Sequence, residues 1–144
     1  MLKVLIVEDE TGIRTIIKKY LSKFDITCIE AENGKKGLEI FTQNKDGIDL
    51  ILMDVMMPEM DGVSATKKIR EISDVPIIML TAKAEDEDEI EGLEVGANDY
   101  ITKPFNLDVL LLRIKKLINL DSDNELELVK EQRAVRKNGR LIEL

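Results

Sequence analysis

The amino-acid sequence predicts a doubly wound α/β domain, in which helices cover both faces of a parallel sheet. Short apolar runs alternate along the chain with stretches of helical periodicity, which is the pattern of repeated strand and helix units. The apolar runs are continuous, as expected for strands that are buried on both faces. Because the connections between units are short, right-handed crossovers are the expected way to join the strands.

The expected elements follow one another in a regular order. Strands are expected over residues 3–7, 26–30, 50–54, 76–80 and 100–102. Helical patterns cover residues 10–22, 34–43, 61–71, 86–95 and 107–120. Asp61 is expected to cap the third helix, because a short acidic side chain before a helix accepts hydrogen bonds from its first amides. Apolar residues of the first helix recur at spacings of three and four and are expected to face the sheet: Ile13, Ile16, Ile17, Tyr20 and Leu21.

The composition restricts the class of protein. The chain has 144 residues, of which 44% are hydrophobic and 35% charged, as is typical of one packed domain. No apolar run is long enough to span a bilayer or to form a signal-peptide core, so we expect a cytoplasmic protein with no membrane partner. The single Cys28 cannot form an intramolecular disulfide, and the absence of histidine excludes histidine catalysis and zinc sites of cysteine and histidine. The net charge of −8 argues against nucleic acid as the partner of the whole chain.

The sequence pattern changes after residue 120. Residues 121–124 are polar, and the short strand patterns that follow contain a hairpin turn at Asn138 and Gly139. So short a segment cannot form a stable core alone. We therefore expect one domain over residues 1–120, a linker over 121–124, and the start of a second, truncated domain over 125–144.

Polar residues stand where the predicted strands end. In doubly wound sheets, ligands bind beyond the carboxyl ends of the strands. Glu8 and Asp9 follow the first strand and Asp54 closes the third, while Thr81 and Lys103 follow the fourth and fifth. We therefore expect three acids, a hydroxyl and an ammonium to converge at one edge of the sheet.

The three acids are a candidate site for a divalent cation. Clustered carboxylates repel one another unless a cation lies among them, and Mg²⁺ prefers a few carboxylate oxygens with positions left open. Alternatively, Glu8, Asp9 and Glu10 are acids that open a helix and complement its dipole. The expected convergence with Asp54 favours the metal site.

Asp54 ends a buried apolar strand, where an acid is costly unless it has a function. A carboxylate near a metal can act as a nucleophile, as in aspartyl-phosphate chemistry. Lys103 would then neutralise a phosphoryl oxygen, and the Thr81 hydroxyl would donate a hydrogen bond to another. Taken singly, Lys103 could be a surface lysine and Thr81 a strand-end hydroxyl. The bond between Lys103 and Pro104 is one where a cis peptide is allowed.

Four segments carry a resemblance to a known family. They are VLIVEDE (residues 4–10), LMDVMMPEMDG (52–62), IMLTA (78–82) and GLEVGANDYITKPF (92–105). With them, residues 1 to about 120 resemble the receiver domain of two-component response regulators, in the OmpR/PhoB subfamily with a winged-helix output domain. The resemblance implies a CheY-like, flavodoxin-like (βα)5 fold with strand order 2-1-3-4-5.

The resemblance also implies roles for individual residues. Asp54 would be phosphorylated by a partner histidine kinase, Lys103 would bind the phosphoryl group, and Thr81 and Tyr100 would form a switch pair. Glu8 and Asp9 would be the acidic pair that binds Mg²⁺, with Asp9 the more direct ligand. Asp54 and the backbone carbonyl of Met56 would complete the protein's ligands. Without the resemblance, the tyrosine would be read as a half-buried strand aromatic.

Activation in this subfamily implies a homodimer through the fourth helix, the fifth strand and the last helix. In the subfamily, a basic residue of the fourth helix usually pairs with a glutamate of the last helix across this surface, but Glu89 and Val109 stand at those positions here. A second usual pair, of an acid near the fifth strand and an arginine of the last helix, is kept as Asp99 and Arg113. Residues 109–112 form an unbroken apolar run on the last helix. We therefore expect a dimer surface that is more hydrophobic than usual.

The predicted function is that of a response regulator, which controls transcription through its output domain and binds DNA only through it. We expect Mg²⁺-dependent self-phosphorylation and slow self-dephosphorylation rather than a conventional enzyme. A Mg²⁺-dependent phosphatase would place a second acid where Met56 stands, and a flavin or nucleotide binder would have a glycine-rich loop after the first strand. A stand-alone receiver that acts through protein contacts remains an alternative.

Overall fold

A computed structural model of the chain describes residues 2–55, 57, 60–81 and 96–118. The chain divides into two compact units, Met1–Leu110 and Leu111–Leu144, and the whole sheet belongs to the first. Of the second unit, the structure describes residues 111–118. The expected helix over 86–95, the linker over 121–124 and the expected segment 125–144 lie outside the described residues.

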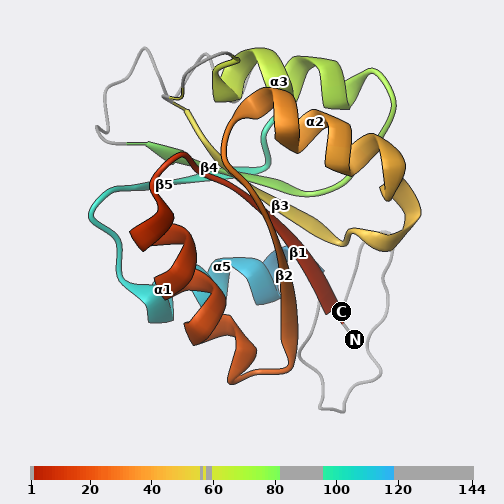
Figure 1. Cartoon of the computed structure of the whole chain (residues 1–144). Helices are drawn as coiled ribbons and strands as arrows, with labels where there is room; N and C mark the ends of the chain where they lie inside the picture. Colours follow the sequence, from red (N-terminus) through yellow and green to blue (C-terminus); the bar gives the residue numbers. More distant parts are fainter. Residues whose placement is uncertain (1, 56, 58–59, 82–95, 119–144) are drawn as a thin grey trace. The chain divides into compact units, whose positions relative to one another are not determined.

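The five strands form one parallel sheet in the order β2-β1-β3-β4-β5, which confirms the predicted fold class (Figure 1). The strands are β1 (Leu2–Val7), β2 (Ile26–Ala31), β3 (Leu50–Asp54), β4 (Ile77–Thr81) and β5 (Asp99–Thr102). The helices are α1 (Thr11–Ser22), α2 (Gly34–Gln43), α3 (Gly62–Arg70) and α5 (Leu107–Ile118), with a short 3₁₀ helix at Lys45–Gly47. Strand order reverses at β1, which lies between β2 and β3 and therefore places the loop after β1 at the switch point.

Alternate strand residues fill the two faces of the sheet. On one face, Leu5, Ile51 and Ile77 pack in a single cluster with Phe41 of α2 and Ile69 of α3. In Figure 1, α2 and α3 lie together on that face and α1 lies on the other. Every residue of β3 and β4 is buried, as the continuous apolar runs predicted, whereas the edge strands β2 and β5 are only partly buried.

Helices α2 and α3 each begin with a side-chain cap. The Asp61 carboxylate accepts a hydrogen bond from the Ser64 amide at 2.7 Å, which confirms the predicted cap of α3. At the start of α2, Asn33 accepts from the Lys36 amide at 2.8 Å. These caps pair amides that would otherwise have no partner within their helices, and they fix where each chain segment leaves the sheet.

The apolar face that the sequence predicted for α1 includes more residues than the sheet covers. Ile17 and Leu21 are fully buried, but Ile16 is 56% exposed. Residues one turn apart lie one above the other on a helix, whereas Ile16 is rotated by about 100° from Ile17. The sheet therefore covers the stripe of Ile17 and Leu21 and leaves Ile16 outside it. No helix within the described ranges is long and apolar enough to cross a membrane.

Candidate functional site

Three carboxylates meet beyond the carboxyl ends of β1 and β3. Glu8, Asp9 and Asp54 each offer one oxygen, and these oxygens lie within 4.8 Å of one another; we call these residues the acidic cluster. Val7 of β1 pairs with Met53 of β3, so the residues that follow leave the sheet side by side. Glu8 and Asp54 are buried, at 0% and 3% exposure, and Asp9 is exposed. The three acids thus converge as predicted.

Glu8 is held by its backbone and its side chain. Its amide donates to the Ala31 carbonyl at 3.0 Å, across the end of β2. Its carboxylate accepts from the Lys103 ammonium at 2.7 Å and from the Glu10 amide at 3.1 Å. The Glu10 side chain makes no capping bond at the start of α1, so the loop turns around the Glu8 carboxylate instead.

Lys103 enters the acidic cluster from the end of β5. Its amide donates to the Thr81 carbonyl at 2.6 Å, which continues the pairing of β5 with β4. The side chain is 18% exposed, and its ammonium lies 2.7 Å from Glu8 Oε1 and 3.3 Å from Asp54 Oδ1. The peptide bond between Lys103 and Pro104 is cis, as the sequence allowed. One ammonium therefore contacts both buried carboxylates.

Burial and nearby charges shift the pKa values of Asp54 and Lys103. Burial, together with the nearby charge of Glu8, raises the pKa of Asp54 from its ordinary value of 3.8 to about 7, although Lys103 opposes the shift. Burial alone would lower the pKa of Lys103, but its hydrogen bond to Glu8 and the charges of Asp54 and Glu8 outweigh that effect and raise it. Asp54 thus changes its protonation near neutral pH, while Lys103 stays charged.

Gly62 fixes the path of the chain behind Asp54. A Cβ atom on Gly62 would collide with the Asp54 carbonyl oxygen, so no larger residue fits without moving the end of β3. The Gly62 amide donates to the Val55 carbonyl at 2.9 Å and closes the loop between β3 and α3. Met56, a predicted ligand through its carbonyl, lies outside the described residues.

The two predicted switch residues lie on neighbouring strands. Thr81 is 5% exposed at the end of β4, where its backbone contacts Lys103. Tyr100 lies in β5, is half-buried and packs against the core cluster on the side of α2 and α3. Their positions are compatible with a switch, whose operation stays a prediction.

The predicted dimer residues are described only in part. Val109 and Leu112 of α5 are 40% and 64% exposed, while Leu110 and Leu111 of the same apolar run are buried. Asp99 opens β5 and its carboxylate accepts from the Tyr100 amide at 2.8 Å. Glu89 lies outside the described residues, and the pairing of Asp99 with Arg113 stays a prediction.

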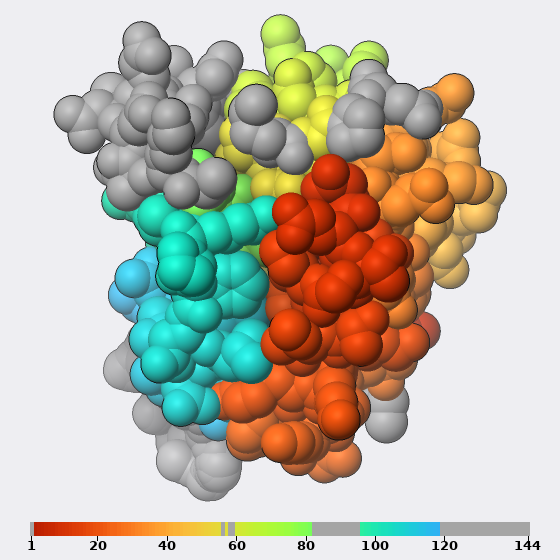
Figure 2. Space-filling model, turned by 60° about the vertical axis from the view of Figure 1, so that its left-hand side comes forward, coloured from red at the N-terminus to blue at the C-terminus, as the bar shows by residue number. Residues whose placement is uncertain are grey.

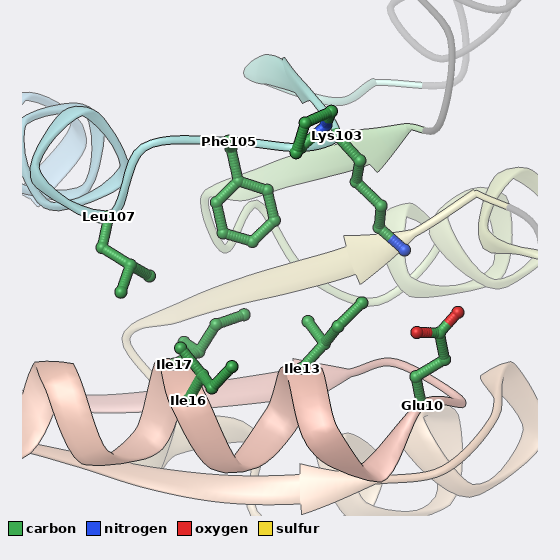
Figure 3. A pocket seen from close by; sticks show the side chains of 8 residues that line it. Glu10, Ile13, Ile16, Ile17, Lys103, Phe105 and Leu107 are labelled. Carbon is green, nitrogen blue, oxygen red and sulfur yellow. The ribbon is translucent and has the colours of Figure 1, made fainter.

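An apolar cavity of about 540 Å³ lies between α1 and the segment after β5. In Figure 3, Ile13, Ile16 and Ile17 point toward Phe105 and Leu107, and the charged groups of Glu10 and Lys103 lie at one end of the cavity. Figure 2 shows the two segments side by side on the surface. Lys103 lines the cavity and also contacts the acidic cluster, so the cluster is bordered by apolar surface on this side.

Arg14 is a contact of the acidic cluster that the sequence did not reveal. Its guanidinium donates to the Glu8 carbonyl at 2.6 Å and to the Glu30 carboxylate at 3.0 Å. The sequence did carry one indication of this contact. Arg14 lies one turn after Glu10, and a helical side chain at that spacing points back toward the loop before the helix.

Strand order and site together define the chain as a CheY-like α/β domain. Residues 4–115 match the response regulator receiver domain, and the chain belongs to that family. It is 42% identical over 125 residues to the transcriptional regulatory protein SrrA of Staphylococcus aureus, in an alignment that covers 87% of this chain and 51% of SrrA. The chain thus spans about half the length of that relative.

Solved receiver domains have the same fold. The receiver domain of Francisella response regulator 1452 is 38% identical, with a TM-score of 0.75 over 83% of this chain and 98% of its own. The BeF3-activated N-terminal receiver domain of RstA from Klebsiella pneumoniae is 35% identical, with a TM-score of 0.74 over 81% of this chain and 97% of its own.

Proposed function

We propose that this receiver domain accepts a phosphoryl group on Asp54 from a histidine kinase and uses it to control transcription through a DNA-binding output domain. The observation that carries the proposal is the buried Asp54 carboxylate, which lies in the acidic cluster and 3.3 Å from the Lys103 ammonium. The similarity to SrrA, a transcriptional regulatory protein, supports the output. By family, this is a phosphoacceptor rather than a conventional enzyme.

The acidic cluster suits Mg²⁺. Its carboxylate oxygens are hard ligands, and burial together with the charge of Glu8 raises the pKa of Asp54 despite the nearby Lys103, so a further cation would stabilise the ionised carboxylate. We infer that Glu8, Asp9 and Asp54 hold the ion, with Asp9 the more direct ligand and the Met56 carbonyl completing the protein's share. When bound, Mg²⁺ would supply positive charge that offsets the carboxylates and the phosphoryl oxygens.

Asp54 is the nucleophile of the proposed transfer. A carboxylate oxygen of Asp54 forms a bond to phosphorus while the bond from phosphorus to the donor nitrogen breaks, and that electron pair leaves with the donor imidazole. The Lys103 ammonium neutralises one phosphoryl oxygen, and the Thr81 hydroxyl donates to another. Because only the ionised carboxylate attacks, a pKa of about 7 makes the metal-free protein a poor nucleophile in mild acid.

The proposed signal passes through Thr81 and Tyr100. Phosphorylation adds about −1.5 to −2 charges and gives the Thr81 hydroxyl a new acceptor to turn toward, which frees space for Tyr100. The surface of the fourth helix, β5 and α5 would then change shape and form a homodimer, as in the OmpR/PhoB subfamily. Asp99, Val109 and Arg113 are the residues proposed for that surface.

The proposed organisation is a receiver over residues 1–120, a linker over 121–124 and the start of a winged-helix output domain over 125–144. A stand-alone receiver acting through protein contacts is the alternative, and reading the gene beyond the codon for Leu144 separates the two. Analytical ultracentrifugation with and without beryllofluoride tests the dimer, and a monomer under both conditions would contradict it.

Incubation with acetyl phosphate and Mg²⁺, followed by intact mass spectrometry, tests the proposed chemistry. The wild-type chain is expected to gain the mass of one phosphoryl group, and Asp54→Ala or addition of EDTA should abolish the gain. Lys18→Ala is a matched control, because it removes a 54% exposed lysine that does not contact Asp54. An unchanged wild-type mass, or equal phosphorylation of Asp54→Ala, would overturn the proposal.

A further inference from the structure

Arg14 joins three segments around the acidic cluster. From the first turns of α1, its guanidinium donates to the Glu8 carbonyl at 2.6 Å, to Glu30 Oε1 at 3.0 Å and to the Thr11 hydroxyl at 3.2 Å. These acceptors belong to the loop after β1, to β2 and to the start of α1. The Arg14 side chain is only 13% exposed, and its bonds to the Glu8 carbonyl and to Glu30 are part-buried, whereas the bond to Thr11 is exposed.

The contact with the Glu8 carbonyl acts on the acidic cluster through the backbone. Glu8 and Asp9 share the peptide unit that carries this carbonyl, so its orientation decides where both carboxylates point. The other contacts of Glu8 engage its amide and its carboxylate. Within the described residues, Arg14 is the side chain that fixes the peptide between the two acids.

Only arginine can make this set of contacts. A guanidinium offers donors in a rigid planar fork, and here Nε, Nη1 and Nη2 each reach a different acceptor. A lysine ammonium at the same place would lack that fork. Lys18 provides the comparison, since it also contacts Glu30, at 3.4 Å, but is 54% exposed.

We propose that Arg14 is a positioning residue for the metal site, which holds the peptide between Glu8 and Asp9 so that both carboxylates face Asp54. This inference rests on the proposed function, because it assigns Arg14 to the Mg²⁺ site described there. Residues that orient metal ligands without touching the metal typically contribute about 10- to 100-fold to metal affinity. Arg14 acts in this way through a backbone carbonyl.

The test compares Arg14→Ala and Arg14→Lys with Lys18→Ala in the full chain. Isothermal titration with Mg²⁺ should show affinity reduced about tenfold in Arg14→Ala, and reduced to a smaller extent in Arg14→Lys. Lys18→Ala, which loses a contact with the same Glu30 but none with Glu8, should bind Mg²⁺ within about twofold of wild type. If Arg14→Ala fails to fold, Arg14→Lys keeps the stem and the charge and serves as the test variant.

Two further readouts separate positioning from a general loss of stability. In acetyl phosphate reactions, Arg14→Lys should need a higher Mg²⁺ concentration for half-maximal rate, while the rate at saturating Mg²⁺ changes little. Without metal, the Glu10 amide, which donates to the Glu8 carboxylate, should exchange hydrogen faster in the Arg14 variants than in Lys18→Ala. Variants that only destabilise the fold would speed exchange across the core as well.

The outcomes of this proposal and of the proposed function are distinguishable. If the wild-type chain binds no Mg²⁺ and gains no phosphoryl group, the proposed function fails. If the wild type binds Mg²⁺ and folded Arg14 variants bind it equally well, only the role of Arg14 is overturned. Equal losses in Arg14→Ala and Lys18→Ala would also overturn it, because each variant removes one positive charge near Glu30 and the effect would then come from that charge.

Discussion

The two ends of the sheet differ in how their polar and charged groups are paired. Beyond the carboxyl ends of the strands, the Lys103 ammonium contacts two carboxylates of the acidic cluster, and burial raises the pKa of Asp54 to about 7. At the amino ends, polar groups are matched one to another. The Asp49 carboxylate accepts from the Lys3 amide at 2.8 Å, just before β3 begins.

The amino end of β5 shows the same matching. The Asn98 side-chain oxygen accepts from the Ile77 amide at 2.9 Å and from Arg70 Nη2 at 2.8 Å, and Arg70 Nε donates to the Gly96 carbonyl at 2.8 Å. Matched polar groups stabilise the fold, whereas buried charges with shifted pKa values are typical of functional sites. Removing a charged group at the carboxyl end and a polar group at the amino end should therefore have opposite effects on stability.

Asp54→Asn is expected to have the largest effect. It should abolish phosphorylation by acetyl phosphate, because the amide cannot act as the nucleophile. The same change should raise the free energy of unfolding of the metal-free protein at pH 8 by about 1 kcal/mol, because it removes a buried charge. Intact mass and urea denaturation measure the two effects, and a less stable Asp54→Asn chain would contradict the description of the carboxyl end.

Gly34→Ala tests how tightly the carboxyl end is packed. A Cβ atom at Gly34, the first residue of α2, would collide with the Met60 carbonyl oxygen in the loop after β3. We expect a loss of about 2–3 kcal/mol in stability by thermal or urea unfolding. Gly12→Ala in α1 is the control, since no atom outside its own stretch of helix lies within 4 Å of its Cβ position, and it should leave stability unchanged or slightly higher.

Asn98→Ala should destabilise without affecting the chemistry. It leaves the Ile77 amide and one Arg70 donor without their acceptor, at a cost of about 1–2 kcal/mol. Asn98→Asp keeps an acceptor oxygen and should retain stability. Phosphorylation of folded Asn98→Ala should stay within about twofold of wild type, and a large loss of activity would show that the two ends are coupled.

A change of pH tests the shifted pKa of Asp54 in the same two proteins. In the folded, metal-free protein Asp54 has a pKa of about 7, well above its value in the unfolded chain, so its proton stabilises the folded state at low pH. This stabilisation is lost as the pH rises toward 7. The difference in unfolding free energy between Asp54→Asn and wild type should therefore grow from about pH 5 to about pH 7 and then level off. A difference independent of pH would contradict the shifted pKa.

The sequence predicted those parts of the site that depend on strand ends. Asp54 and Lys103 come together because parallel strands end at the same edge, and that rule needs only the strand pattern. The Asp61 cap was also predictable, because a capping side chain and its amide are close in the sequence.

Contacts that depend on three-dimensional packing were not predictable. The bond from Arg14 to the Glu8 carbonyl ends on a backbone atom, which leaves no trace in residue types. Arg70 and Asn98 are joined only because the end of α3 lies beside the start of β5. The exposure of Ile16 depended on how α1 is rotated against the sheet, and hydrophobic spacing alone does not fix that rotation.

The hydrogen bond between Lys103 and Glu8 has a consequence for how the protein is made. Its two residues are separated by 95 positions, so Glu8 is synthesised about 5–20 s before its ammonium partner at usual translation rates. During that interval the nascent chain can pair β1 with β2 and β3, but it lacks the cation that contacts Glu8 and Asp54. A chain released early would therefore retain acids without the lysine and could not complete the site. A site that holds both the acidic cluster and Lys103 thus marks a chain synthesised beyond the end of β5.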